Sequence, residues 1–477
     1  MKAIRLHHTR RRHMADRAQT KNTTMTHLER ASFGTKLGVI LATAGSAVGL
    51  GNVWRFPYMT GEYGGAAFII IYIGCVLLFG IPCMVSEFII GRHAASNTAR
   101  AYHSLSGGTP WAAIGYFGVF TGVLITSYYA VVAGWCLQYI IASALGHLKG
   151  SPEFFANYFS TFEKDPFKPV LWTVAIILIT HYVIVHGVRD GIEKASKLMM
   201  PALFVLLLIV VVSACMLPGA MKGVTFLFKP DFSKVGGDVL LGALGQAFYS
   251  LSIGMGCLCT YASYFSRQTN LMKSAVQIGV IDTSVAILAG LMIFPAAFSV
   301  GINPDSGPSL VFITLPNVFQ QAFASVPAVG YVVAIAFYAL LALAALTSLI
   351  SLHEVSTAFV HEEMHTTRKR AAWVVTGTCS VIGAVCSLSL GKWDFLKIGD
   401  RSLFDLFDFA TGQIMLPLGG FLTCLFVGWY LPHKMVRDEF TNWGTLRGKL
   451  FHTYLFCIKY VCPTCILLIF LHQFGLI

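Results

Sequence analysis

Charged side chains are scarce in this chain. Asp, Glu, Lys and Arg together make up 12% of the 477 residues, whereas hydrophobic residues make up 56%. About a quarter of the residues of a typical soluble domain are charged, so this scarcity excludes a soluble protein. It indicates a protein that crosses a membrane many times. The short alternating segments of a membrane β-barrel are absent, so the spans are predicted to be helices. We expect eleven, over residues 37–60, 67–90, 112–145, 169–186, 195–216, 238–265, 272–300, 328–360, 371–389, 404–430 and 452–473.

Acidic residues are fewer than basic ones, 22 against 34, which gives a formal net charge of +12. With the N-terminus inside, 23 of the 34 Lys and Arg fall on cytoplasmic segments and nine on the outer side, while Arg55 and Lys459 lie within spans. Cytoplasmic loops of membrane proteins carry such an excess, so we expect the N-terminus inside and the C-terminus outside. This distribution indicates a multi-pass protein of the cell's inner (plasma) membrane, with the lipid bilayer rather than nucleic acid as its partner.

Two further absences limit the function classes. The basic segment 1–34 lacks the apolar core of a signal peptide and is interpreted as a cytoplasmic tail. The long outer loops lack cysteine beyond the span ends, which excludes a disulfide framework. One C-x-x-C pair, Cys462 and Cys465, lies in the last apolar run without a βαβ context, and we interpret it as core packing.

A glycine signature occurs twice. Residues 48–52 read VGLGN and residues 253–257 read IGMGC, each inside an apolar run. Glycine within a helix costs roughly 1 kcal/mol against alanine, so the signature predicts two spans that break at these points. Broken backbone at membrane depth persists only where it faces protein, water or a ligand. Paired breaks in the two halves of a chain therefore indicate the binding site of a secondary transporter.

The two breaks also organise the chain. Spans 1–5 and spans 6–10 each begin with a broken span, and because five is odd the second set enters the membrane from the opposite side. This predicts an inverted repeat with one span left over. We expect a tail over 1–34, a ten-helix core over 35–430 with repeats at 35–217 and 238–430, and a segment 431–477 that holds a cytoplasmic loop and an accessory eleventh helix.

The residues around the first signature resemble those of a known family. The run GSAVGLGNVWRFPY at 45–58 resembles the first span of the neurotransmitter:sodium symporters. The resemblance spans roughly residues 30–475 and includes GIP at 80–82 with Glu87, SYY at 127–129, QAFYSLS at 246–252 and AALTS at 344–348. It implies a bacterial eleven-span member with an all-α, 5+5 inverted-repeat fold of the LeuT type, spans 1 and 6 broken, and one accessory helix. It also implies Na⁺-coupled uptake of amino acids or related amines.

The resemblance places the substrate between the two breaks. Half-helix N-termini offer N–H groups and C-terminal ends offer carbonyls, which suits a zwitterionic amino acid. The amides near Leu50 and Gly51 would take its carboxylate, helped by the Tyr129 hydroxyl. Met255 adapts its shape, and no buried charge is evident in the pocket, which favours a neutral, hydrophobic or aromatic substrate. The expected substrate residues are Ala47, Leu50, Gly51, Ile125, Tyr129, Tyr249, Ser250, Ser252, Met255, Ser348 and Leu352, with Ser46 and Ser351 at the pocket wall.

Two sodium sites are implied by the same resemblance. Sodium is a hard cation that needs oxygen ligands, which unwound helices supply as carbonyls. The first site would use Ala47, Asn52, Ser250 and Asp282, completed by the substrate carboxylate. The second would use the carbonyls of Gly45, Val48 and Ala344 with the hydroxyls of Thr347 and Ser348. No organic cofactor is implied.

Asp282 departs from the family pattern, which often has Asn there. A carboxylate in the middle of a span costs about 2.5–3.5 kcal/mol on insertion scales. The chloride-dependent branch places an anion beside positions matching Tyr72, Gln246 and Ser250, so a fixed carboxylate could make chloride unnecessary. It could also take up a proton when sodium leaves, which would make the return step proton antiport. A third interpretation is a protonated or hydrogen-bonded Asp without a transport role.

Two charged pairs are expected to act as gates. By resemblance, Arg55 and Asp408 form the outer gate through water, with Tyr249 closing beneath them. The inner pair would be Arg30 and Glu362. Phe33 stands where tryptophan is commoner in the family. Exposed ion pairs contribute only ~0–1 kcal/mol, which suits gates that must open.

Two rival functions remain open. The sequence HEEMH at 361–365 matches the H-E-x-x-H zinc motif, and NPDSG at 303–307 vaguely resembles the acidic third-ligand motif of intramembrane metalloproteases. The predicted topology separates the two by the membrane thickness, ~30 Å, so we do not expect an enzyme. A transport-inactive sensor or scaffold of the same fold is the other rival. Our prediction is a sodium-coupled amino acid symporter working by alternating access, with no prediction of its oligomeric state.

Overall fold

The computed structural model describes residues 32–301, 310–391, 393, 397 and 401–473. Regular secondary structure in these residues is helical. The α-helices are α2 (Lys36–Ala47), α3 (Phe56–Glu62), α4 (Ala66–Cys75), α5 (Ile81–Ala94), α6 (Thr98–Ser106), α7 (Ala113–Ala144), α8 (Pro152–Glu163), α9 (Lys168–Val185), α10 (Lys194–Cys215), α11 (Ala220–Phe228), α12 (Gly237–Ser250), α13 (Cys257–Ala262), α14 (Leu271–Ser299), α15 (Leu315–Ala322), α16 (Pro327–Glu363), α17 (Arg368–Leu390), α18 (Leu403–Phe409), α19 (Leu416–Leu425), α20 (His433–Phe440), α21 (Phe451–Phe456) and α22 (Cys462–Gln473). Short π-helical turns join several of them, including Gly51–Arg55, Val76–Gly80 and Cys457–Val461.

The expected spans correspond closely to these helices. Within the described residues, nine helical segments are long and apolar enough to cross a membrane, and the bent pair Lys36–Ala47 and Gly51–Glu62 makes a tenth. Span 6 is the pair α12 and α13, separated by residues 251–256. The all-α architecture with spans 1 and 6 broken is therefore confirmed.

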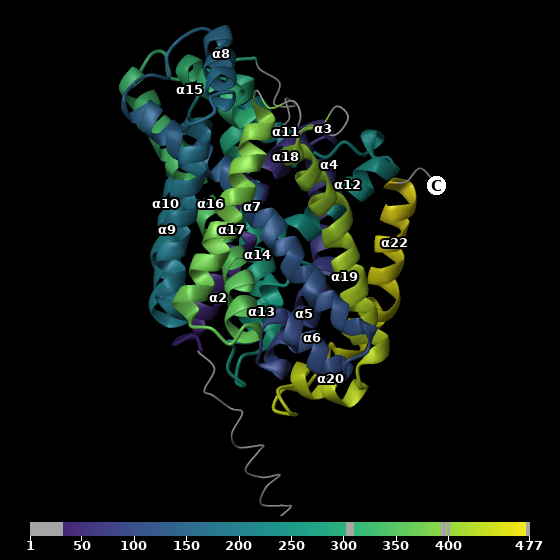
Figure 1. The fold of residues 1–477 in the computed structure, drawn as a ribbon. Helices are drawn as coiled ribbons and strands as arrows, with labels where there is room; N and C mark the ends of the chain where they lie inside the picture. Colours follow the sequence, from purple (N-terminus) through teal and green to yellow (C-terminus); the bar gives the residue numbers. More distant parts are fainter. Residues whose placement is uncertain (1–31, 302–309, 392, 394–396, 398–400, 474–477) are drawn as a thin grey trace, which may run out of the picture.

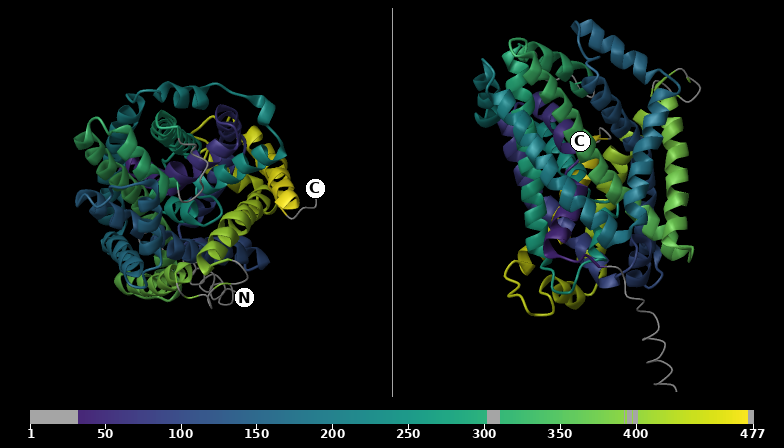
Figure 2. Two further views of the ribbon diagram at one scale, coloured as in Figure 1. Left: turned by 90° about the horizontal axis from the view of Figure 1, so that it is seen from above. Right: turned by 90° about the vertical axis from the view of Figure 1, so that its left-hand side faces the viewer.

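The broken spans lie among long intact ones. The long helices α7 and α16 pack along each other, and α9 and α17 pack against both. Helix α2 contacts α10, α14 and α16, while α13 contacts α5 and α16. The view from above in Figure 2 shows the long helices gathered around the elements of spans 1 and 6. The breaks are thus enclosed by protein, which broken backbone in a membrane requires.

Several loop helices were not predicted. Helices α8 and α15 cover one end of the molecule and α20 lies at the opposite end (Figure 1). Helix α8 begins at a capping serine, Ser151, whose side chain accepts from the Phe154 amide, and it buries Phe155 and Phe162 on one face. These helices are too short to cross a membrane, so a search for spans overlooks them.

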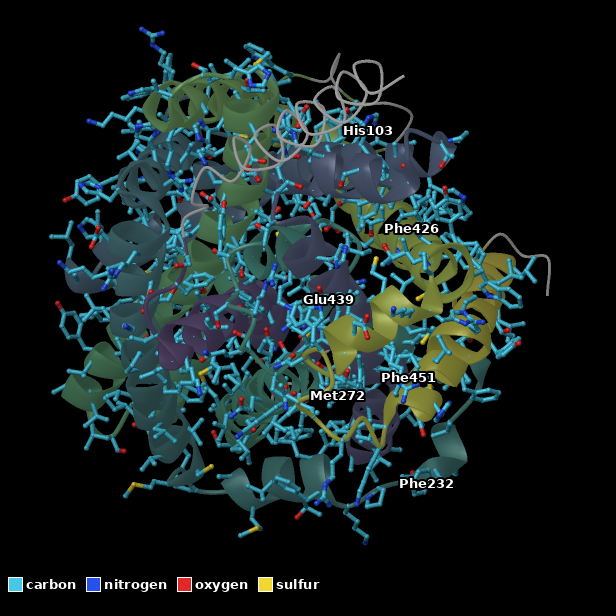
Figure 3. The ribbon with its side chains drawn as sticks, turned by 90° about the horizontal axis from the view of Figure 1, so that it is seen from below. His103, Phe232, Met272, Phe426, Glu439 and Phe451 are labelled. Carbon is cyan, nitrogen blue, oxygen red and sulfur yellow. The ribbon has the colours of Figure 1, made fainter. Side chains whose placement is uncertain are left out.

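Helix α20 is held to α5 by a buried ion pair. Arg92 Nε lies 2.7 Å from Glu439 Oε2, and the two side chains are 2% and 1% exposed. His93 Nδ1 lies 2.9 Å from the other carboxylate oxygen of Glu439. Figure 3 shows this end of the molecule from below, with Glu439 near the middle of the view and Phe232 toward its edge. This ion pair holds α20, which lies in the loop before span 11, against α5, the second half of span 2.

Candidate functional site

The helix of span 1 breaks at the first glycine signature. Helix α2 ends at Ala47, and Val48 is extended, with φ −71° and ψ 106°. The two halves of the span meet at 51°. The break follows the prediction from the sequence, and it leaves main-chain groups beside Gly49 and Leu50 available for other partners.

The break in span 6 is wider and depends on positive φ angles. Ser252, Gly254 and Gly256 have φ of 55°, 88° and 77°. At Gly254 a side chain is also excluded by space, because a Cβ would lie 2.3 Å from the Leu416 carbonyl oxygen. Only glycine satisfies both conditions, which explains why the second signature carries glycine here.

A buried acid stabilises the second break. Glu87 of α5, which is 2% exposed, accepts hydrogen bonds from the amides of Gly254 (2.7 Å) and Cys259 (3.3 Å). These N–H groups have lost their helical acceptors at the break. The sequence pointed to Glu87 only as part of a family motif, and its partners could not be predicted without the fold.

Between the two breaks lies a small enclosed cavity of about 30 Å³. At its wall the Tyr129 hydroxyl accepts a hydrogen bond from the Leu50 amide at 2.9 Å. The lining residues are Ser46, Ala47, Gly49, Gly51, Ile125, Tyr129, Tyr249, Ser250, Ser252, Met255, Ser348 and Leu352. All of these except Gly49 belong to the set expected from the sequence. Leu50 and Ser351, also expected, lie outside this lining.

Serine hydroxyls and carbonyls meet at the same wall. Ser46 Oγ donates to Ser351 Oγ at 2.8 Å, and Ser252 Oγ donates to the Ser46 carbonyl at 2.9 Å. Ser348 Oγ lies 3.5 Å from that carbonyl. These groups are neutral, so this part of the pocket can hydrogen-bond an ammonium group but carries no fixed charge.

Residues expected in the second sodium site come together. Thr347 Oγ1 lies 2.9 Å from the Ala344 carbonyl oxygen and 3.2 Å from that of Val48. A Cβ on Gly45 would lie 3.3 Å from the Thr347 Cβ, so Gly45 faces the same point. Spans 1 and 8 thus supply oxygen atoms around one position, the donor type that a hard cation needs.

Residues expected in the first sodium site also converge, around Asp282. Asn52 Nδ2 donates to Asp282 Oδ1 at 2.7 Å, and Asn52 Oδ1 accepts from the Gly49 amide at 2.9 Å. Ser250 Oγ lies 2.9 and 3.0 Å from the two carboxylate oxygens, and the Tyr72 hydroxyl donates to one of them at 2.9 Å. Asp282 is fully buried. The carboxylate is therefore surrounded by hydrogen-bond donors, which compensate for its burial.

The outer charged pair lies above the cavity without direct contact. The Arg55 guanidinium carbon lies 4.6 Å from the centre of the Tyr249 ring, a cation–π distance. The Tyr128 hydroxyl accepts a hydrogen bond at 3.2 Å from Thr411 Oγ1, three residues after Asp408 in the chain. In the described part of the chain no direct ion pair joins Arg55 to Asp408, and their action as a gate stays a prediction.

At the opposite end the structure reveals a contact that the sequence did not suggest. Glu354, fully buried in α16, accepts from Tyr264 at 2.7 Å and from Arg368 at 2.9 Å. An acid in the last third of span 8 was the available signal, because ionisable groups inside spans mark functional sites. Glu362 accepts from the Asn97 amide at 2.8 Å. The expected partner of Glu362, Arg30, lies outside the described residues.

The two cysteine and histidine motifs do not form the sites their patterns suggest. His361 Nδ1 lies 2.5 Å from the Thr366 carbonyl, and HEEMH joins no metal-type cluster within the described residues. The NPDSG motif lies outside them. Cys462 lies beside Cys83 and Cys424, and Cys465 is not part of this group.

Comparison with known proteins identifies the family. The sequence profile of the sodium:neurotransmitter symporter family matches residues 30–150 and 147–476. The chain belongs to this family. The symporter is 34% identical to the uncharacterized sodium-dependent transporter YhdH of Bacillus subtilis, over 95% of this chain and 100% of that one. It is 27% identical to the sodium- and chloride-dependent creatine transporter 1 of Bos taurus, over 86% of this chain and 72% of that one.

A solved structure shares the fold. The crystal structure of MhsT in complex with L-phenylalanine superposes with a TM-score of 0.84, at 40% identity, covering 93% of the symporter and 99% of that chain. The symporter is therefore a sodium-dependent transporter of a small molecule and crosses the membrane several times. The zinc-protease alternative is set aside, because the family transports its substrate without chemical change.

Proposed function

We propose that this symporter takes up a neutral amino acid with a hydrophobic or aromatic side chain, driven by sodium. The observation that carries the proposal is the cavity between the two breaks. There the Leu50 amide and the Tyr129 hydroxyl form one polar end, and serine oxygens lie nearby. Ile125, Met255 and Leu352 supply an apolar end. MhsT, which shares the fold, was solved with L-phenylalanine, which supports an aromatic substrate.

The substrate would replace an internal hydrogen bond. The Leu50 amide and the Tyr129 hydroxyl now bind each other, and a substrate carboxylate would accept from both. The cavity of about 30 Å³ is smaller than an amino acid, so Tyr249 and the serine side chains would move outward on binding. Such a closed pocket suits a transporter in which binding and gate movement are coupled.

We propose two sodium sites. The first is Ala47, Asn52, Ser250 and Asp282, and it shares Ala47 and Ser250 with the substrate pocket. The second is Gly45, Val48, Ala344, Thr347 and Ser348. Each site joins a broken span to an intact one, so bound sodium would hold these spans together. Sodium entering along the membrane potential supplies about 2.3 kcal/mol per charge per 100 mV.

Chloride independence follows from Asp282 in this proposal. Its carboxylate lies where the chloride-dependent branch would place an anion, between Tyr72, Ser250 and Asn52. A fixed negative charge beside the first sodium site makes an exchangeable anion redundant. Sodium-dependent uptake should therefore proceed in gluconate as in chloride. Uptake that collapses without chloride would refute this part of the proposal.

We propose the topology of the positive-inside pattern. The end carrying α20 would face the cytoplasm, and the end carrying α8 and α15 would face outward, in the plasma membrane. Arg55, Asp408 and Tyr249 would then close the outer path, and Glu354 with Tyr264 would close the inner one. In alternating access, the outer group of residues would open while the inner group stays closed, and the reverse.

The test is a thermal-shift panel of the twenty amino acids, each in NaCl and in KCl. A ligand at 100 times its Kd stabilises the folded state by about 2.7 kcal/mol, which gives a clear rise in melting temperature. We expect hits among the hydrophobic or aromatic amino acids in NaCl only. Hits confined to acidic or basic amino acids would refute the substrate class. Binding without uptake in proteoliposomes would favour the sensor alternative.

A further inference from the structure

Three thiols converge at a place that the transport mechanism does not use. Cys83 of α5, Cys424 of α19 and Cys462 of α22 are fully buried. Their sulfur atoms lie within 4.8 Å of one another, and those of Cys83 and Cys424 are 3.3 Å apart. Helix α19 packs against both α5 and α22, and the three helices lie side by side in Figure 1. In the described part of the chain this is the one group of three His, Cys, Asp or Glu side chains that converges so closely.

The local structure directs Cys462 into this cluster. A π-helical turn over Cys457–Val461 immediately precedes it and changes the phase of the span. Such turns inside helices often accompany functional sites. Cys465, the partner in the C-x-x-C pattern, is instead half-exposed. The sulfur neighbours of Cys462 therefore come from spans 2 and 10 and not from its own C-x-x-C pattern.

We propose that Cys83, Cys424 and Cys462 bind one soft monovalent cation with the chemistry of Cu(I). Sulfur ligands select such ions over sodium, magnesium and calcium. A metal–sulfur bond of about 2.3 Å in a planar three-coordinate site puts the sulfur atoms about 4 Å apart. The observed separations fall within 4.8 Å, so modest side-chain adjustment completes the site.

The donor set favours Cu(I) over zinc. Zinc in structural sites is tetrahedral and takes four ligands. Here the described residues offer three, and no His, Asp, Glu or fourth Cys joins the group. Three-coordinate binding by sulfur alone is the arrangement that a soft monovalent ion accepts.

Binding of the ion is coupled to the release of protons, because cysteine binds a metal ion as the thiolate. The thiols of Cys83, Cys424 and Cys462 each lose a proton to solvent, and a metal–sulfur bond replaces each S–H bond. Cu(I) affinity should therefore fall as the pH is lowered.

A bound ion would link three spans. Span 2 carries Cys83 next to the segment that presents Glu87, span 10 carries Cys424, and accessory span 11 carries Cys462. The site lies apart from the substrate cavity and the proposed sodium sites. Its occupation can therefore be measured whatever the substrate proves to be.

The experiment measures Cu(I) binding by the purified full chain, under anaerobic reducing conditions, in competition with the chromogenic chelator bicinchoninate. We expect one Cu(I) per chain, and X-ray absorption should show sulfur neighbours only, at about 2.3 Å. Absence of Cu(I) uptake, or nitrogen and oxygen neighbours at the metal, would overturn the proposal. This measurement needs no variant.

Variants then assign the ligands. Cys424→Ser and Cys462→Ala should each abolish the stoichiometric binding. Cys386→Ser, which changes a buried cysteine of α17 outside the cluster, should retain it. The melting temperature without metal shows whether each variant is folded, and a variant that is not folded is replaced by Cys83→Ser. Unchanged Cu(I) binding in the folded cluster variants would refute the assignment.

Discussion

The substitution Gly49→Ala tests the proposed substrate pocket with the smallest possible change. A Cβ on Gly49 would lie 2.5 Å from Ser348 Oγ and 2.8 Å from the Tyr129 hydroxyl. Both distances are too short for real Cβ contacts, so at least one hydroxyl must move. The two hydroxyls come from different helices, Ser348 from α16 and Tyr129 from α7.

The size of the effect follows from how firmly each hydroxyl is held. Ser348 Cβ would be 3.5 Å from the new methyl group, so rotation of the serine hydroxyl relieves the first contact. The Tyr129 hydroxyl is fixed by the Leu50 amide at 2.9 Å and by a rigid ring, so it must shift as a unit. Overpacking of this kind costs about 1–3 kcal/mol. If the cost falls on the substrate-bound state, affinity should drop roughly 5- to 150-fold.

The assay is sodium-dependent amino acid binding, followed by thermal shift with the substrate found in the panel. Gly245→Ala in α12 is the matched control, because a Cβ there meets no atom within 4 Å. Alanine at such a helical position should be neutral or stabilise by up to about 1 kcal/mol. Wild-type affinity in folded Gly49→Ala would refute the placement of the substrate beside Tyr129. An equal loss in Gly245→Ala would show that the effect is not local.

Three further predictions concern single charges. Asp282→Asn should weaken sodium-dependent substrate binding in gluconate by about tenfold or more, because hydrogen bonds to a charged group contribute ~1.5–3 kcal/mol. Chloride should restore the affinity of this variant. An unchanged affinity in both anions would contradict the prediction. Arg368→Ala leaves the Glu354 carboxylate buried without its cationic partner. Unfolding by heat or denaturant should then show a loss of stability of about 3–5 kcal/mol, whereas exposed Arg370→Ala should not. Burial raises the pKa of Glu163 from 4.5 to about 7. Between pH 4.5 and about 7 the folded state therefore keeps a proton on Glu163 that the unfolded chain has released. Stability should fall as the pH rises through this range. Glu163→Gln should flatten the dependence of the melting temperature on pH.

Much of the fold could be predicted because its strongest constraints are local. Apolar runs predict spans, and the glycines at 49, 51, 254 and 256 mark where two of them break. Gly254 shows why this signal is reliable, since its φ of 88° and its contact with Leu416 both exclude any side chain. The residues that line the cavity were predicted through the family resemblance, which gives their shared position without showing how they touch.

Contacts between distant spans could not be predicted in the same way. The sequence separates Glu354 from Tyr264 by ninety positions, and nothing in either neighbourhood specifies the other. Cys462 is a similar case: the sequence predicts that it packs in the core, but its neighbours Cys83 and Cys424 are far away along the chain. Arg92 and Glu439 likewise meet only because span 11's preceding loop folds back on span 2.

The buried acids and the broken helices depend on each other. Two amides released by the break in span 6 are satisfied by Glu87. The break in span 1 is satisfied through Asn52, which accepts from the Gly49 amide and donates to Asp282. A carboxylate at membrane depth is costly alone, and so is an unpaired amide, but each compensates for the other. In the proposed function, the same residues that make the broken helices stable in a membrane would also form the place where sodium and an amino acid bind.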